Sequence, residues 1–175
     1  MARILFITGG PGSGKSSVAR RVAEQFDRSF HLQVDELREG MVRGFAFPSL
    51  PFPDEVATQF RVARRTASFM AREYADSGIT FVIDDAPLPS DFADWYAELF
   101  ADEQVVRIML VTDGSTMVER MRRRNGPFDE GLIAIGAEAL SEYIATLPRD
   151  GWTVIDNTNS TLDDTVSEVL VRFRS

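Results

Sequence analysis

The stretch Gly9-Gly10-Pro11-Gly12-Ser13-Gly14-Lys15-Ser16 fits the pattern G-x-x-x-x-G-K-[ST] at every fixed position. Lysine and arginine total 19 residues, and all of them except Lys15 are arginine. A compact ammonium on a flexible stem fits between two phosphates, where a planar guanidinium is too wide. This stretch therefore predicts that the chain binds a nucleoside triphosphate.

The residues on either side of this glycine-rich loop support the same interpretation. A short apolar run over residues 3–8 is typical of a buried strand, and Val18, Val22 and Phe26 form one apolar stripe of a following helix. In such a strand–loop–helix unit, backbone N–H groups and the positive end of the helix converge on phosphate oxygens. The Ser16 hydroxyl is expected to bind Mg²⁺. The residues expected to hold the nucleotide are Gly9, Gly10, Pro11, Gly12, Ser13, Gly14, Lys15, Ser16 and Ser17.

Composition limits the classes of protein that need to be considered. With 175 residues and 44% apolar residues, the chain is expected to form one domain over residues 1–175. No apolar run approaches the ~20 residues that span a bilayer, and no secretion signal is recognised, so we expect a cytoplasmic protein without a membrane partner. The absence of cysteine excludes disulfides and thiolate metal sites, and the net charge of −8 argues against a nucleic-acid partner.

Apolar runs alternate with helical patterns along the chain, which predicts an α/β fold with three layers: a parallel sheet with helices on both faces. Strands are expected at 3–8, 30–34, 80–84, 105–111 and 152–155. Helices are expected at 15–27, 54–76, 91–101, 116–124, 130–146 and 162–173. Capping-box spacing marks helix starts at Thr116 with Glu119 and at Ser160 with Asp163, and Asn125-Gly126 is typical of a helix end.

Aspartates follow four of the five expected strands, at the sheet edge where open α/β folds bind their ligands. Phe81-Val82-Ile83-Asp84-Asp85 resembles a Walker B strand end, where a carboxylate holds Mg²⁺. We expect Asp84 to be the metal residue because the apolar run ends directly before it. Asp85 is the alternative, or a substrate contact; a turn or N-cap role would need no ligand for either residue.

Asp35 follows the second expected strand and is the candidate general base. A carboxylate one strand away from the terminal phosphate can accept a proton from an attacking hydroxyl, and phosphoryl transfer needs little further covalent chemistry. The simpler alternative is that Asp35 caps the next helix.

Arg120 and Arg124 lie four residues apart on one expected helix face, so both could clamp phosphates and stabilise charge in the transition state. Arginines at the end of a helix also complement its dipole without any ligand. His31, the only histidine, is expected to be a structural residue of its strand. Phe45, Phe47 and Phe52 form either an apolar lid over an acceptor or a loop attached to the core.

Taken together, these residues resemble the P-loop kinases with an adenylate-kinase-like core, and within them chloramphenicol phosphotransferase and related small-molecule kinases. The similarity rests on the glycine-rich loop and on four short motifs: Val34-Asp35-Glu36-Leu37, Ile83-Asp84-Asp85, Asp113-Gly114 with Arg120 and Arg124, and Asp156-Asn157-Thr158. Asn125-Gly126-Pro127 departs from the antibiotic kinase, as does the acceptor region 38–60, so chloramphenicol is not the expected substrate.

The resemblance implies a P-loop NTPase fold with strand order 2-3-1-4-5, ATP with Mg²⁺, and transfer of the γ-phosphate to a hydroxyl of a small molecule. It implies that Asp35 is the base and that Arg120 and Arg124 belong to a lid-like segment at about 116–130. Residues 36–60 would form the acceptor side, and Asn157 and Thr158 would lie near the adenine.

Two other functions stay open. A nucleoside or nucleotide kinase would use arginines such as Arg38, Arg43 or Arg61 for an anionic acceptor. A non-catalytic nucleotide-binding regulatory module, or a simple ATPase, would phosphorylate no acceptor. A GTPase is not expected because the N-K-x-D motif is missing, and a hexameric AAA-type motor is not expected because the chain lacks room for its helical domain.

Overall fold

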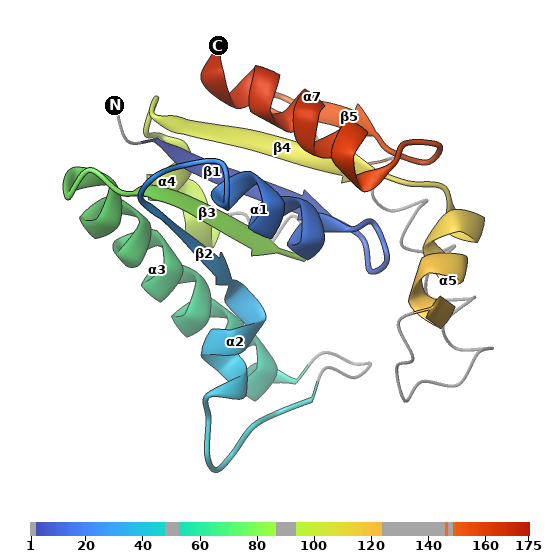
Figure 1. Cartoon of the computed structure of the whole chain (residues 1–175). Coiled ribbons are helices and arrows are strands. Elements are labelled where there is room, and N and C mark those ends of the chain that lie inside the picture. Colours follow the sequence, from blue (N-terminus) through green and yellow to red (C-terminus); the bar gives the residue numbers. More distant parts are fainter. Residues whose placement is uncertain (1–2, 48–52, 87–93, 124–145, 147–148) are drawn as a thin grey trace.

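The computed structural model describes residues 3–47, 53–86, 94–123, 146 and 149–175. Within them a parallel five-stranded sheet has the order β2-β3-β1-β4-β5, as the resemblance implied (Figure 1). The strands are β1 (Ile4–Gly9), β2 (Ser29–Gln33), β3 (Thr80–Asp85), β4 (Val105–Val111) and β5 (Thr153–Asp156). Each predicted strand is confirmed, with ends displaced by no more than one residue.

The helices of the described residues are α1 (Lys15–Ala23), α2 (Val34–Glu39), α3 (Asp54–Asp76), α4 (Ala97–Phe100), α5 (Gly114–Arg123) and α7 (Leu162–Arg174). The prediction missed α2, which has only six residues and begins directly after β2. Within the predicted helix at 91–101, residues 94–96 form a 3₁₀ turn and residues 97–100 form the short α4, while residues 91–93 lie outside the described residues. The predicted helix at 130–146 lies outside the described residues except for its last position.

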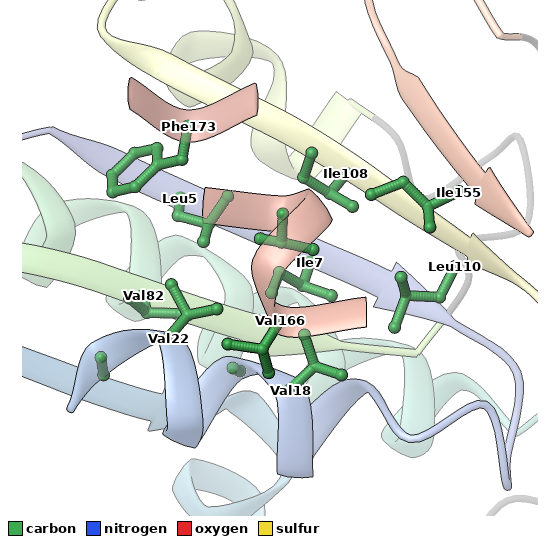
Figure 2. Close-up of a cluster of buried hydrophobic side chains, with 13 residues drawn as sticks. Leu5, Ile7, Val18, Val22, Val82, Ile108, Leu110, Ile155, Val166 and Phe173 are labelled. Carbon is green, nitrogen blue, oxygen red and sulfur yellow. The ribbon is translucent and has the colours of Figure 1, made fainter. Parts of the chain in front are cut away.

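Two apolar layers cover the sheet, one on each face, which confirms the three-layer arrangement. On one face, Val18 and Val22 of α1 and Val166 and Phe173 of α7 pack against alternate residues of the strands (Figure 2). On the other face, Ala63, Ala67 and Ala71 of α3 and Leu99 of α4 pack against the intervening residues. Successive side chains of β3 point to opposite faces of the sheet. Val82 belongs to the first layer, whereas Phe81 and Ile83 belong to the second. The two aspartates that end β3 therefore also point to opposite faces.

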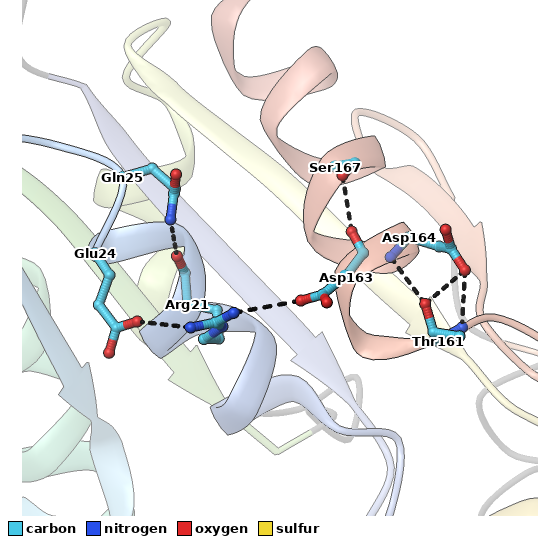
Figure 3. A network of polar contacts seen from close by, with 7 residues as sticks. All are labelled: Arg21, Glu24, Gln25, Thr161, Asp163, Asp164 and Ser167. Atoms are coloured by element: carbon cyan, nitrogen blue, oxygen red, sulfur yellow. Dashed lines mark hydrogen bonds and ion pairs between the residues drawn. The ribbon is translucent and has the colours of Figure 1, made fainter.

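The two predicted capping boxes were displaced from the true helix starts. Thr161, not Ser160, caps α7: its hydroxyl accepts from the Asp164 backbone N–H, and the Asp164 carboxylate accepts from the Thr161 N–H (Figure 3). At α5, Asp113 accepts from the Thr116 N–H, so Thr116 lies inside the first turn rather than at the cap. Hydrogen bonds from the Ser115 hydroxyl, the Thr116 N–H and the Thr116 hydroxyl lower the pKa of Asp113 to about 2, because they favour its ionised form.

In the part of the chain that the structure describes, no helix combines the length and the apolar character needed to cross a membrane.

Candidate active site

The glycine-rich loop joins β1 to α1 at the carboxyl end of the central strand, as predicted (Figure 1). Gly12 and Gly14 have φ values of 80° and 86°, which side chains with a Cβ rarely adopt. A Cβ on Gly12 would also lie 2.5 Å from the carbonyl oxygen of Met117 in α5, so the loop packs directly on that helix. The backbone therefore curls tightly before α1, and the Ser13 N–H donates to the Gly10 carbonyl within the loop at 3.0 Å.

A cavity of about 610 Å³ adjoins this loop. Its lining runs from the loop and the first residues of α1 across to the start of α7, and includes Lys15, Arg120, Arg123 and Asn157. Its volume falls in the range of small-molecule and cofactor sites. A second cavity, of about 650 Å³, lies at the opposite end of the strands near Arg3 and Thr80. Parallel sheets bind ligands at the carboxyl ends of their strands, so we assign the site to the first cavity and its surroundings.

Asp84 lies on the α1 face of β3 and is hydrogen-bonded at both carboxylate oxygens. The Ser16 hydroxyl donates to Oδ1 at 2.8 Å, and His31 Nε2 lies 2.6 Å from Oδ2. The Asp84 side chain is only 3% exposed. The two residues predicted to serve Mg²⁺, Ser16 and Asp84, are thus in direct contact, while the contact of His31 with Asp84 was not predicted.

Asp85 points to the opposite face of the sheet, where it joins a buried polar network. Its Oδ2 accepts from Arg64 Nε at 2.7 Å and from the Tyr96 hydroxyl at 3.0 Å. The Asp85 side chain is fully buried and that of Arg64 is 3% exposed. Burial raises the pKa of Tyr96 well above its ordinary value, so the phenol stays protonated and remains a donor. Asp85 therefore fixes α3 and the segment before α4 to the sheet.

The contact between Asp85 and Arg64 leads to a prediction about the stability of the fold. Asp85→Asn would remove the charge of the buried carboxylate that pairs with Arg64, and breaking such a pair costs about 3–5 kcal/mol. Urea unfolding should show a loss of that size. Asp163→Asn is the matched control, because Asp163 and Arg21 form an exposed pair at 3.4 Å (Figure 3), and such pairs contribute about 0–1 kcal/mol. Equal losses in the two variants would contradict the assignment.

Asp35 lies in the first turn of α2, which begins at Val34 with Gln33 as its N-cap. The predicted alternative, that Asp35 caps this helix, is therefore wrong. The surrounding protein raises the pKa of the Asp35 carboxyl by desolvation, and the negative charge of Asp85 acts in the same direction. The positive charges of Lys15 and Arg38 lower the pKa of Asp35 and so oppose this rise. The Asp35 carboxylate is therefore close enough to the Lys15 ammonium to interact with it electrostatically. The Asp35 side chain nevertheless remains 56% exposed and accessible from outside.

Arg38, one helical turn after Asp35, is a buried cation beside the candidate base. Its Nη1 lies 3.8 Å from Asp35 Oδ1, and its side chain is only 5% exposed. The guanidinium stacks on the Phe60 ring at 3.8 Å, and Arg64 approaches the same ring at 4.7 Å. Arg43 and Arg61, the other arginines considered for an anionic acceptor, are exposed.

The aromatic loop after α2 is attached to α3 rather than free. Gln59 accepts from the Ala46 N–H and donates to the Gly44 carbonyl, and Arg38 Nη2 donates to the Ala46 carbonyl at 2.9 Å. Phe45 is partly buried against Arg38, whereas Phe47 is 78% exposed. Phe52 lies outside the described residues. The loop is thus fixed to α3 by hydrogen bonds, and the Phe47 ring faces solvent.

Of the remaining predicted residues, Arg120 and Asn157 line the cavity. Arg120 Nη2 donates to the Asn157 carbonyl at 2.9 Å, so α5 is tied to the segment after β5. Asn157 is buried, and its amide donates to the Ser13 carbonyl of the glycine-rich loop at 2.8 Å. The Thr158 hydroxyl accepts from the Asp113 N–H. Arg124 and the rest of the predicted lid segment beyond Arg123 lie outside the described residues.

Residues 4–147 match a family model named AAA_33 and described as an AAA domain. The chain belongs to this family. The P-loop core that was expected from the sequence is therefore confirmed, and the expectation that the chain is not a hexameric motor stays a prediction.

Several proteins that this AAA_33 chain resembles are named as kinases. It is 25% identical over 172 residues to a uridylate kinase from Schizosaccharomyces pombe, covering 93% of this chain and 90% of that protein. A sugar kinase from Janibacter sp. HTCC2649 has a TM-score of 0.70 at 21% identity, over 99% of this chain and 95% of the other. Shikimate kinase from Acinetobacter baumannii, solved with shikimate, has a TM-score of 0.69 at 18% identity, over 97% and 92%. At these identities the two structures show the kinase-like fold alone.

The donor set of the site suits the cofactor that such a fold implies. Among the described residues, no group of three or more His, Asp or Glu side chains is placed to hold a metal ion. Mg²⁺ at a phosphate site does not need such a group, because it keeps several waters and combines one or two protein oxygens with substrate phosphates. Ser16 Oγ and Asp84 Oδ1, in contact at the start of α1, are oxygens of this kind.

Proposed function

We propose that this chain is an ATP-dependent phosphotransferase that moves the γ-phosphate of Mg-ATP to a hydroxyl of a small molecule, such as a sugar, an antibiotic-like compound or a nucleoside. The observation that carries the proposal is the position of Asp35. This exposed carboxylate lies within the field of Lys15, at the edge of the sheet where the glycine-rich loop ends. The Asp35 carboxylate and the Lys15 ammonium thus interact electrostatically, as a proton acceptor and a phosphate-binding cation of one site would.

Each residue has a role in this proposal. The loop from Gly9 to Ser17 cradles the phosphates, and Lys15 neutralises charge on the β- and γ-phosphates. Ser16 and Asp84 would hold Mg²⁺, which shields the phosphate oxygens when bound. Arg120 and Arg124 would add positive charge from the lid-like segment at 116–130, and Asn157 and Thr158 would lie on the adenine side. Residues 36–60 would form the acceptor side of a single domain, and the cytoplasmic location remains part of the proposal.

The chemical step follows from these positions. The acceptor oxygen forms a bond to the γ-phosphorus while the bond from that phosphorus to the bridging β–γ oxygen breaks, so that ADP leaves. The acceptor hydroxyl gives its proton to Asp35. Because the transition state spreads charge over phosphate oxygens, positioning and charge neutralisation provide most of the acceleration.

A panel of acceptors tests this function. ADP release from Mg-ATP is measured with sugars, hydroxylated antibiotics, nucleosides and nucleoside monophosphates, and the product is identified by mass spectrometry. We expect at least one acceptor to stimulate ADP release and to gain the mass of one phosphoryl group. Nucleotide binding without a phosphorylated product from any acceptor would favour the regulatory-module or simple-ATPase alternative.

A nucleotide kinase is the second candidate, favoured by the buried Arg38 beside Asp35. A guanidinium in this place suits the phosphate of a nucleoside monophosphate, and the uridylate kinase relative agrees with such an acceptor. If the acceptor is a nucleoside monophosphate, Arg38→Gln should raise its KM strongly and leave the KM for ATP unchanged. Arg61→Gln on the exposed face of α3 is the control. A neutral acceptor that works equally well in Arg38→Gln would contradict this candidate.

A further inference from the structure

His31 lies in the middle of β2 and is the only histidine of the chain. Its side chain is 11% exposed, and its Nε2 lies 2.6 Å from Asp84 Oδ2. A carboxylate offers only acceptors, so Nε2 must carry the hydrogen of this bond. The imidazole is therefore a hydrogen-bond donor held against the candidate metal residue.

The geometry of the sheet explains why the two side chains meet. Phe30 and Leu32 of β2 pack on the α3 face, so alternation turns His31 to the α1 face. In the parallel register, His31 pairs with Val82 and Gln33 pairs with Asp84, which makes His31 and Asp84 diagonal neighbours on that face. The imidazole bridges this diagonal, because its Nε2 lies 2.6 Å from Asp84 Oδ2.

The two oxygens of the Asp84 carboxylate have different hydrogen-bond partners. Oδ2 is bonded to His31 on β2, whereas Oδ1 is bonded to the Ser16 hydroxyl at the start of α1. A buried carboxylate with both oxygens engaged cannot rotate freely. The oxygen next to Ser16 is therefore held at the start of α1, beside the glycine-rich loop.

We propose that His31 is a positioning residue that holds the Asp84 carboxylate in the orientation needed to bind Mg²⁺ with the nucleotide. This inference rests on the proposed function and deepens it. His31 itself contacts neither the metal nor the phosphates; it acts through Asp84. Removing such a supporting hydrogen bond typically costs 10–100-fold in metal affinity.

The test separates metal binding from nucleotide binding. ATP affinity is measured by calorimetry with Mg²⁺ and with EDTA, in the unaltered protein and in His31→Leu, His31→Gln and Ser29→Ala. His31→Leu removes the donor, whereas the glutamine amide can replace Nε2. Ser29→Ala is the control, since Ser29 donates from an earlier position of β2 to the Ala23 carbonyl and leaves Asp84 untouched.

We expect His31→Leu to weaken the Mg²⁺-dependent part of ATP binding by about 10–100-fold and to leave binding in EDTA unchanged. His31→Gln should restore most of the loss, and Ser29→Ala should cause none. If Mg²⁺ strengthens ATP binding equally in the unaltered protein and in His31→Leu, the role of His31 is wrong while the proposed function stands. If Mg²⁺ has no effect in the unaltered protein, the proposed metal site and this inference both fail.

A second measurement decides the question if His31→Leu does not fold. Because His31 is the only histidine, its ring nitrogens give single, already assigned signals in ¹⁵N NMR spectra of the unaltered protein. We expect a hydrogen on Nε2 and a shift of its signal when Mg²⁺ is added to the ATP-bound protein. An Nε2 without hydrogen, or an Nε2 signal that does not shift when Mg²⁺ is added, would overturn the proposal.

Discussion

Asp35→Asn is expected to lower turnover by about 10²–10⁴-fold, the contribution typical of a general base. Asparagine keeps the size of the side chain but cannot accept the proton of the acceptor hydroxyl. Because Asp35 is not expected to bind the nucleotide, ATP affinity should barely change. Steady-state kinetics together with calorimetry measure both quantities.

The pH profile gives this prediction a second readout. Desolvation and Asp85 raise the pKa of Asp35 above 3.8, so more of this carboxyl is protonated at a given acidic pH than for an ordinary aspartate. The protonated form cannot act as a base, and kcat/KM should fall as the pH drops through this raised pKa. The acidic limb assigned to Asp35 should disappear in Asp35→Asn.

Glu39→Gln serves as the control for Asp35→Asn, because Glu39 is an exposed acid in the last turn of the same short helix. Its turnover should remain close to that of the unaltered protein. Normal turnover in Asp35→Asn would remove Asp35 as the base, and equal losses in both variants would point to damage of α2.

Lys15→Ala is expected to reduce turnover by about 10²–10³-fold, as loss of one preorganised donor in an active site does. It should also weaken ATP binding, because Lys15 lines the cavity and neutralises phosphate charge before the reaction as well as during it. Lys15→Arg should recover little, since a guanidinium fork does not fit where a narrow ammonium is required. Binding of a fluorescent ATP analogue and steady-state kinetics measure the two effects.

Arg20→Ala is the control for Lys15. Arg20 lies on the same helix, with a side chain that is 75% exposed and paired only loosely with Glu24 at 3.6 Å. Arg20→Ala removes one positive charge, as Lys15→Ala does, but should change neither ATP binding nor turnover. Full activity in Lys15→Arg would show that any cation suffices and would contradict the role given to the single lysine.

Local patterns of sequence were enough to predict the sheet. The central strands β1 (Ile4–Gly9) and β3 (Thr80–Asp85) carry apolar runs that are buried on both faces, and each run is followed by a polar residue or a glycine at the carboxyl edge. The long helix α3 was predicted with its observed bounds because its apolar stripe persists over 23 residues. In contrast, α2 has six residues and no repeating stripe, and it depends on the burial of Val34 and Arg38 for its position.

The site was predicted where a motif is contiguous and missed where a contact spans the chain. The glycine-rich loop could be recognised from its own residues. The sequence favoured Asp84 over Asp85 as the metal residue because the apolar run ends directly before it. The fold adds that Asp84 contacts Ser16, whereas Asp85 pairs with Arg64 on the opposite face of the sheet. Arg64 was missed because it is one of many arginines, and only the fold brings it 2.7 Å from Asp85, 21 residues away.

The contact of His31 with Asp84 could have been predicted only from the pairing of the two strands that carry them. The alternation of His31 with Phe30 and Leu32 was visible in the sequence, but its contact with Asp84 depends on β2 lying beside β3 in a particular register. That register connects residues 53 positions apart. Long-range pairing of this kind is determined by packing of the whole sheet, not by local preference.

The structure of a crystal grown with Mg²⁺ and a non-hydrolysable ATP analogue tests the central claim most directly. The account predicts the terminal phosphate between Lys15 and Asp35, and the metal beside Ser16 Oγ and Asp84. A nucleotide bound elsewhere, or a terminal phosphate with Asp35 directed away from it, would contradict the account.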